Sequence, residues 1–202
     1  MEAGAGDAPL DERIVAAIER LSRALRALLQ DAVKGHGLSP VQGHILLYLR
    51  ERPERLRHVA SIAREFGLTA PTVSDSVSAL VGKGLVERGL WAADGRRSTL
   101  RLTPAGETLC GELTTWTAPL RDAVALLPQA DREAALLFLM RLIERLYDAG
   151  VVSVARMCLT CRFFHPGAAG AASSYCSLLK KPLEPANLRV ECPDHAPATT
   201  PA

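Results

Sequence analysis

The segment VASIAREFGLTAPTVS, residues 59–74, has the spacing of two short helices joined by a tight turn. Gly67 supplies the turn, and Ala63 is small enough to let the two helices cross closely. The apolar residues expected to be buried at this crossing are Ile62, Phe66, Leu68 and Val73. The segment therefore predicts a helix-turn-helix.

Four helices are predicted up to the end of this motif, two before it and the two that form it. They cover about residues 10–35, 39–52, 58–66 and 70–82. The first has apolar residues at steps of three and four, the pattern of a long amphipathic helix. Ser39 followed by Pro40 is typical of a helix start, and Thr69 is the expected cap of the helix that begins near Ala70.

Two strands are predicted directly after the helix-turn-helix. Leu85–Arg88 and Ser98–Leu102 are short strand-like runs, and the turn-rich Ala93–Arg96 joins them. A helix-turn-helix followed by such a hairpin is a winged arrangement, and wings of this kind reach DNA. Arg96 or Arg97 at the tip is expected to enter a minor groove, where narrow A·T tracts concentrate negative potential. Asp94 is expected to pair with an arginine and hold the shape of the tip.

The second helix of the motif is the predicted recognition helix. Its outward-facing residues are expected to be Ala70, Pro71, Thr72, Ser74, Asp75 and Ser78. The hydroxyls of Thr72, Ser74 and Ser78 suit bonds to phosphates or bases, and Asp75 suits the N4 amine of cytosine. Double-stranded DNA is therefore the expected partner of this face.

Composition agrees with a mainly α protein that has a small β-hairpin wing. Hydrophobic residues make up 48% of the 202 residues but aromatic ones only 4%, so the core must be built from Leu, Val, Ile and Ala. The formal charge of +2 favours no partner by itself. Between Lys83 and Arg101, however, basic residues outnumber acidic ones, and this local excess favours phosphate.

Helices are predicted again after the wing. Thr103-Pro104 starts one that extends to about Leu127, with a kink or break at Pro119. A last long helix is predicted from Asp131 to Asp148.

In this order the motifs resemble those of the MarR family of bacterial regulators over residues 10–149. The stretches that carry the resemblance are LTAPTVS (68–74), KGLVER (83–88), and DGRR (94–97) running into LTPAG (102–106). The resemblance implies a homodimer formed by the first and last long helices, and a winged helix-turn-helix on an inverted-repeat operator. It also implies, as an alternative input, a small aromatic effector bound between the dimer helices and the DNA-binding lobe. Asp75 and Gly95 depart from the family pattern, which often has basic residues at these places.

The C-terminal segment carries four cysteines with the spacing C-x2-C-x14-C-x15-C, a feature that the resemblance does not explain. They are Cys158, Cys161, Cys176 and Cys192. Three interpretations stay open: an iron–sulfur cluster held by all four thiolates, a zinc ion, or unrelated thiols. The zinc site could use the pair Cys192 and His195 and leave Cys176 spare. We favour the cluster, because a regulator needs an input and an accessible cluster responds to oxygen, nitric oxide or iron supply. Apolar residues expected to surround it are Phe163, Phe164, Tyr175, Leu178 and Leu179.

The remaining expectations concern organisation and class. We expect disordered ends at 1–9 and 197–202 and a cysteine-rich metal or iron–sulfur module at 150–196. Because no targeting segment or membrane span is visible, we expect a cytoplasmic protein that keeps its thiols reduced. No catalytic constellation is evident, so an enzyme is not expected. A thiol oxidoreductase would need a βαβ context around Cys158 and Cys161, and none is predicted there. Cys110 is interpreted as a buried small hydrophobe.

Overall fold

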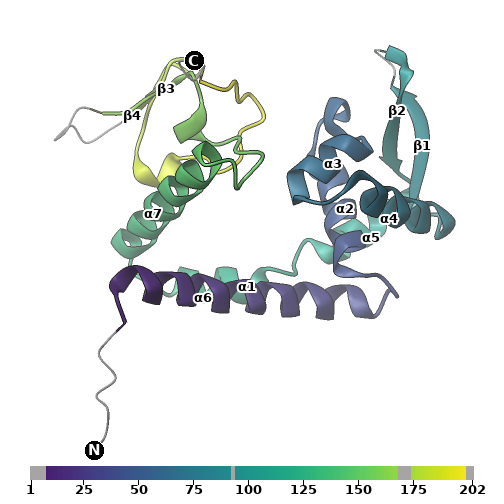
Figure 1. Cartoon of the computed structure of the whole chain (residues 1–202), viewed down its shortest axis with the longest axis horizontal. Helices are drawn as coiled ribbons and strands as arrows, with labels where there is room; N and C mark the ends of the chain where they lie inside the picture. The colour runs from purple at the N-terminus through teal and green to yellow at the C-terminus, as the bar shows by residue number, and fades with distance from the viewer. Residues whose placement is uncertain (1–7, 92–93, 168–173, 199–202) are drawn as a thin grey trace, which may run out of the picture. The chain divides into compact units, whose positions relative to one another are not determined.

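The computed structural model describes residues 8–91, 94–167 and 174–198, with backbone only at 91 and 94–97. The predicted disordered ends fall largely on residues 1–7 and 199–202, outside the described part of the chain. The fold is mainly helical with small antiparallel sheets, and a winged helix-turn-helix lies within it, as predicted (Figure 1). Among the described residues, no helix is both long and apolar enough to cross a membrane.

The chain divides into two compact units. The first contains the chain up to Arg57 and Asp75–Asp122. Its elements are α1 (Leu10–Lys34), α2 (Pro40–Glu51), η1 (Glu54–Leu56), most of α4 (Ala70–Gly82), β1 (Val86–Trp91), β2 (Asp94–Leu102), α5 (Pro104–Leu113) and the start of α6 (Ala118–Ala125). Fully buried aliphatic side chains form its core, among them Leu29, Ile45, Leu46, Leu49, Leu80, Leu100 and Leu113. The low aromatic content therefore gives the aliphatic core that composition predicts.

Local hydrogen bonds explain why α2 begins where it does. The Ser39 hydroxyl accepts from the Gln42 backbone N–H, and the Gln42 side chain accepts from the Ser39 N–H, so the two form a capping box. Pro40 occupies the first helical position, where its missing N–H costs nothing. The helix start predicted at Ser39-Pro40 is confirmed.

The start of α5 is tied to the base of the wing. The Thr103 hydroxyl accepts from the Gly106 N–H and donates to the Gly84 carbonyl at 2.6 Å. The Thr103 N–H donates to the Leu85 carbonyl. Gly106 packs directly on that same carbonyl, at a distance that leaves no room for a Cβ. These contacts fix where the helix leaves the hairpin.

The hairpin differs in detail from its prediction. β1 and β2 pair antiparallel in regular register from Val86 opposite Leu102 to Leu90 opposite Ser98, and both strands extend further than expected. The register then shifts: Trp91 lies opposite Asp94, and the pairing passes over residues 95–97 of β2. The turn predicted at 93–96 therefore lies partly in a strand, because Asp94, Gly95 and Arg96 belong to β2, as does Arg97. Ala93 falls outside the described residues.

The base of the wing is attached to the segment that follows α2. The Leu100 N–H donates to the Arg57 carbonyl at 2.7 Å, and the Arg101 guanidinium binds the Glu54 carboxylate at 2.6 Å. These bonds hold the hairpin at its buried end.

The second unit contains His58–Ser74 and the chain from Ala123 onward. Its elements are α3 (Val59–Phe66), α7 (Gln129–Asp148), η2 (Cys158–Thr160), β3 (Phe164–His165), β4 (Ser174–Cys176), β5 (Lys181–Leu183) and η3 (Pro185–Asn187). β3, β4 and β5 form one antiparallel sheet in that order. The structure thus groups α7 with the cysteine segment.

The turn of the helix-turn-helix has the predicted chemistry. The His58 ring accepts from the Ser61 N–H and caps α3, and Gly67 ends it in the left-handed conformation at φ 62°. Of the four residues predicted to be buried, Ile62 and Val73 are fully buried, and Ala63 at the helix crossing is buried as well. Phe66 and Leu68 are half-buried.

The helix predicted from Thr103 to about Leu127 is two helices. α5 ends at Leu113 and α6 begins at Ala118, so the break precedes Pro119, which lies in the first turn of α6. Proline fits a first turn because its ring and missing N–H disturb only a helix interior. The sequence correctly indicated an interruption near Pro119, but the interruption lies before the proline, between Leu113 and Ala118.

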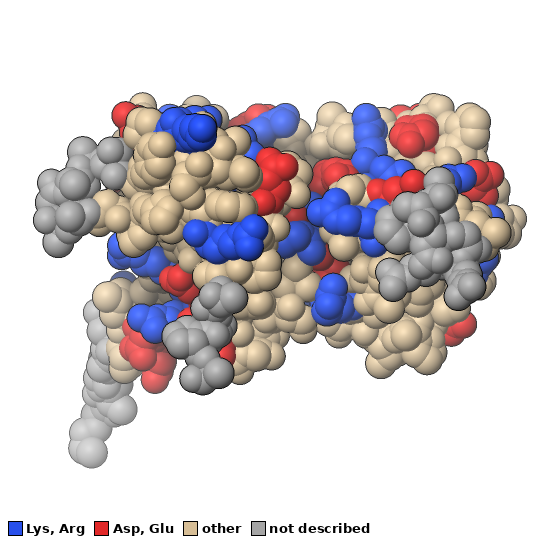
Figure 2. Space-filling model, turned by 90° about the horizontal axis from the view of Figure 1, so that it is seen from above, with Lys and Arg blue, Asp and Glu red and all other residues tan. Residues whose placement is uncertain are grey.

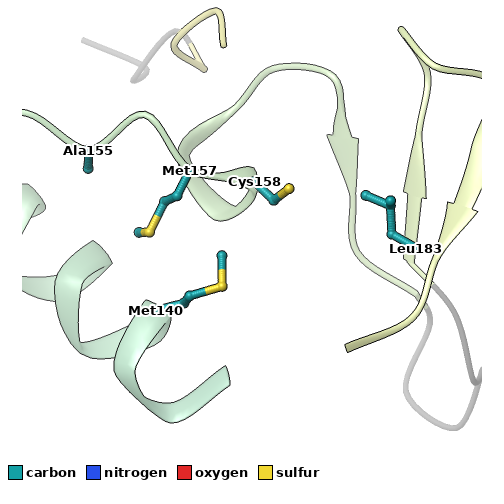
Figure 3. Packing of buried hydrophobic residues seen from close by; sticks show 5 residues of the cluster. All are labelled: Met140, Ala155, Met157, Cys158 and Leu183. Atoms are coloured by element: carbon teal, nitrogen blue, oxygen red, sulfur yellow. The ribbon is translucent and has the colours of Figure 1, made fainter. Parts of the chain in front are cut away.

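The core of the second unit is small. It consists of Met140 on α7 together with Ala155, Met157, Cys158 and Leu183. Figure 3 shows Met140 and Met157 facing each other, while the Cys158 side chain points away from them on the side of Leu183. One end of this core is therefore formed by a thiol.

We predict that Gly106→Ala lowers the free energy of unfolding by roughly 2 kcal/mol or more, because the added Cβ overlaps the Leu85 carbonyl oxygen. Gly111→Ala in the same helix is the matched control. A Cβ there meets nothing nearer than Arg50 Nη1 at 3.7 Å, so helix propensity should leave stability unchanged or raise it by about 0.5–1 kcal/mol. Urea unfolding followed by circular dichroism measures both; equal effects would contradict the packing argument.

Candidate nucleic-acid interface and cysteine pocket

The predicted recognition surface lies on α4. Ala70, Pro71, Thr72, Asp75 and Ser78 are exposed, and Ser74 is half-buried. On the opposite side of the helix, Val73, Val77 and Leu80 are fully buried. The helix thus has an apolar side within the protein and a side of short polar residues in solvent. That geometry suits a helix that approaches base edges.

Two hydroxyls of this surface are already positioned by neighbours. The Thr69 hydroxyl lies 2.8 Å from that of Thr72 and accepts from the Thr72 N–H, which caps the start of α4. The Ser78 hydroxyl accepts from the Arg88 guanidinium on β1 at 3.1 Å. Sequence reasoning did not single out Arg88, although it lies in the basic stretch between Lys83 and Arg101. Its contact with Ser78 places a permanent positive charge beside the exposed surface of α4.

The basic residues of the wing are only partly described. The backbone of Arg96 and Arg97 lies in β2, and their side chains and that of Asp94 fall outside the described part of the chain. The predicted support of the tip by Asp94 stays a prediction. On the face shown in Figure 2, the drawn Lys and Arg side chains are interspersed with Asp and Glu. The candidate interface is therefore indicated by the helix-turn-helix and its hairpin, and not by a patch of one charge sign on that face.

All four tail cysteines line one pocket in the second unit. The residues around it are Cys158, Cys161, Phe163, Phe164, Cys176, Leu178, Leu179, Leu183, Arg189, Cys192 and Asp194. Four of the five apolar residues expected to surround the cysteines are therefore present. Tyr175 is not among them and is 42% exposed. Strand pairing explains this, because Tyr175 alternates in β4 with Cys176 and their side chains point to opposite faces.

Arg189 supplies hydrogen bonds to two of the sulfurs. Its backbone N–H donates to Cys158 Sγ at 3.2 Å, and its guanidinium lies 3.8 Å from Cys192 Sγ. Burial raises the pKa of the Cys158 thiol; the Arg189 N–H opposes this rise, and the other three pocket cysteines add to it. Sequence reasoning missed Arg189, since a lone arginine in a proline-rich segment has no spacing pattern that marks it.

The two tail histidines are placed away from the sulfurs. His195 Nε2 lies 3.1 Å from both the hydroxyl and the carbonyl oxygen of Thr160. Burial lowers the pKa of His195, which favours the neutral ring. His165 is exposed on β3. Neither lines the pocket, whereas Cys176 does.

The four cysteines line the pocket from four separate positions in the chain. In the described part of the chain, no group of three or more His, Cys, Asp or Glu side chains has the arrangement of a site for one metal ion. A tetrahedral zinc would require four ligand atoms within about 2.3 Å of one centre. The pocket offers instead four thiols on apolar walls, with hydrogen-bond donors to two of them.

Cys110 lies apart from this pocket, in α5 of the first unit, and is fully buried. Burial, reinforced by Glu107, raises the pKa of its thiol to about 11. The interpretation of Cys110 as a small buried hydrophobe agrees with this environment.

Part of the chain is similar to known bacterial regulators. Residues 36–97 match the MarR family. The uncharacterized HTH-type transcriptional regulators Rv3095 of Mycobacterium tuberculosis and Mb3122 of Mycobacterium bovis are each 39% identical over 64 residues, which is 32% of this chain. The chain spans about 40% of the length of these curated relatives.

Solved structures extend the likeness in fold. The transcriptional regulator PA3341 is 26% identical, with a TM-score of 0.60 over 67% of this chain and 98% of its own. MepR of S. aureus in its DNA complex is 23% identical, with a TM-score of 0.57 over 65% of this chain and 96% of its own. The similarity to MepR shows the fold.

We predict that Cys110 resists alkylation in the folded protein. With a pKa of about 11, its reactive thiolate is scarce at pH 8 and grows only as the pH rises towards that value. Iodoacetamide at pH 8, followed by mass spectrometry, should modify Cys161, Cys176 and Cys192 of reduced, metal-free protein at least about tenfold faster than Cys110. Urea is the control and should make all five cysteines reactive; fast labelling of Cys110 without urea would contradict its burial.

Proposed function

We propose that this chain is a DNA-binding transcriptional regulator of the MarR type. The observation that carries the proposal is the order of its elements: a capped helix-turn-helix with a short polar surface on α4, followed directly by a paired hairpin. The match of residues 36–97 to the MarR family covers this same stretch. The fold shared with MepR, which is known in complex with DNA, adds support.

DNA contact is assigned to two elements. The exposed residues of α4 enter the major groove, with Thr72, Ser74 and Ser78 on phosphates or bases and Asp75 on a cytosine amine. Arg96 and Arg97 of β2 bind in or beside the minor groove. Arg88 adds a phosphate contact, because its guanidinium already reaches the surface of α4.

The regulator works as a homodimer. In α1, only Leu29 and Val33 near the C-terminal end are buried. Leu10 and Leu21 are 71% and 52% exposed. They lie on the face that also carries Ile14, Ile18, Leu25 and Leu28, all half-buried. A helix of 25 residues with an uncovered apolar stripe is the kind that a partner helix covers. Two recognition helices then meet successive major grooves about 34 Å apart on an inverted repeat.

The input is an iron–sulfur cluster held by Cys158, Cys161, Cys176 and Cys192. The four thiols line one apolar pocket, which includes Cys176 and not His195. This supports a cluster that uses all four thiolates, such as a [4Fe–4S] cluster with one cysteine on each iron atom, over a zinc site that uses His195 and leaves Cys176 spare. A bound cluster supplies sensitivity to oxygen, nitric oxide or iron supply. The protein contributes the apolar walls and the Arg189 hydrogen bonds, both of which tune such a site.

The wild-type protein should bind duplexes selected from a random pool, with an affinity that falls steeply with salt. Arg96→Ala should weaken binding to every duplex and reduce the slope of log Kd against log salt by about 1, because one phosphate-region contact is lost. Fluorescence anisotropy titrations at several salt concentrations measure both quantities. Arg145→Ala, at an exposed position of α7, is the control. An unchanged slope for Arg96→Ala would remove the wing from the interface.

Cys176→Ser and His195→Ala separate the cluster from zinc. Protein purified without oxygen should be brown and contain iron and sulfide; Cys176→Ser should lose both, because it removes one of four thiolates. His195→Ala should keep them, since His195 faces Thr160. Visible spectra and metal and sulfide assays give the result, with Cys110→Ala as the control for cysteine loss. Colourless protein with zinc that depends on His195 and not on Cys176 would refute the cluster.

A further inference from the structure

Arg156 joins the cysteine segment to the helix-turn-helix within the second unit. Its Nη2 lies 2.5 Å from Glu65 Oε2 on α3, and its Nε lies 2.6 Å from Glu191 Oε1. The Arg156 and Glu65 side chains are only 16% and 15% exposed. A largely buried guanidinium between two carboxylates holds both in a defined orientation, because its N–H donors are fixed in one plane.

One end of this link is bound to the cysteine pocket. Glu191 directly precedes Cys192, and the Cys192 N–H donates to the Arg156 carbonyl at 2.8 Å. Arg156 also stands two residues before Cys158, whose N–H donates to the Arg189 carbonyl at 2.9 Å. Both the side chain and the backbone of Arg156 therefore follow the position of the segment that carries Cys192.

The other end is bound to the motif that positions α4. Glu65 lies in the last turn of α3, just before the left-handed turn at Gly67. Within that turn the Leu68 N–H donates to the Ala63 carbonyl at 2.9 Å, and α4 begins at Ala70. A displacement of Glu65 is therefore a displacement of the turn that sets the start of the recognition helix.

We infer that Arg156 transmits the state of the cysteine pocket to the helix-turn-helix and so sets DNA affinity. The inference rests on the proposed function. When the pocket loses the group that holds its thiolates, the segment at 189–192 shifts and Glu191 moves away from Arg156. The guanidinium stays charged at every physiological pH, so it re-orients towards the carboxylates that remain. Because Arg156 is bonded to Glu65, its movement displaces α3. The arrangement with Glu191 bound to Arg156 and the arrangement without it then have different DNA affinities.

Glu65→Gln tests the link at the end farther from the cysteines. The probe is a duplex selected from a random pool by the cluster-loaded wild type, and Kd is measured by anisotropy for loaded and cluster-stripped protein. Wild type should show a ratio of about tenfold or more between the two states, within the usual range of allosteric coupling. In Glu65→Gln the ratio should fall to about twofold or less, while iron content and visible spectrum stay those of wild type.

Two further variants keep the test decisive. Glu191→Gln breaks the other end of the link and should also abolish the ratio, so the test stands even when Glu65→Gln fails to fold. Arg141→Gln, at an exposed position of α7, is the matched control and should keep the wild-type ratio. A full ratio in both glutamate variants would overturn the link and leave the proposed sensor intact. A wild type whose Kd is the same loaded and stripped would overturn the sensor, and the link with it.

Discussion

The segment after α7 has too small an apolar core to hold three short strands in place by burial alone. That core consists of five residues, one of them a cysteine. The other forces that order the segment converge on the same place: the thiols of one pocket, the Arg189 bonds to two sulfurs and the ion pairs of Arg156. Under the proposed function, a group bound by the thiols would add to this order, as in small metal-stabilised domains.

The first unit is held differently. Fully buried Leu and Ile side chains fill its core, and side-chain caps fix the starts of α2 and α5. The contact of Gly106 with the Leu85 carbonyl and the bond from Leu100 to Arg57 hold the wing at its buried end. None of these contacts involves a titratable cysteine or a bound group. The contacts that hold the wing thus lie within the first unit, whereas the proposed sensing is assigned to the second.

Local chemistry explains what the sequence could predict. Ser39-Pro40, Gly67 and Thr103-Pro104 act within a few residues of themselves, so caps and turns were predicted correctly. The four cysteines shared a spacing pattern that indicated one site, and they line one pocket. Asp94, Gly95 and Arg96 were predicted as part of a turn but lie in β2, because the strands pair again at Trp91 and Asp94 after a register shift that turn propensity does not indicate. The Arg156–Glu65 bond spans 91 positions and follows no periodicity, and Arg189 acts largely through its backbone, so no signal in the sequence marked either.

The uncovered stripe of α1 also bears on how much of the regulator a cell must make. If a partner copy covers the face with Leu10 and Leu21, the stability of this helix rises with protein concentration by mass action. Occupancy of an operator then depends on gene dosage more steeply than in proportion, because assembly precedes binding. At a low concentration of the protein few dimers would form, and the operator would stay unoccupied whatever the cysteine pocket holds. The amount of protein made would then affect operator occupancy in addition to the state of the pocket.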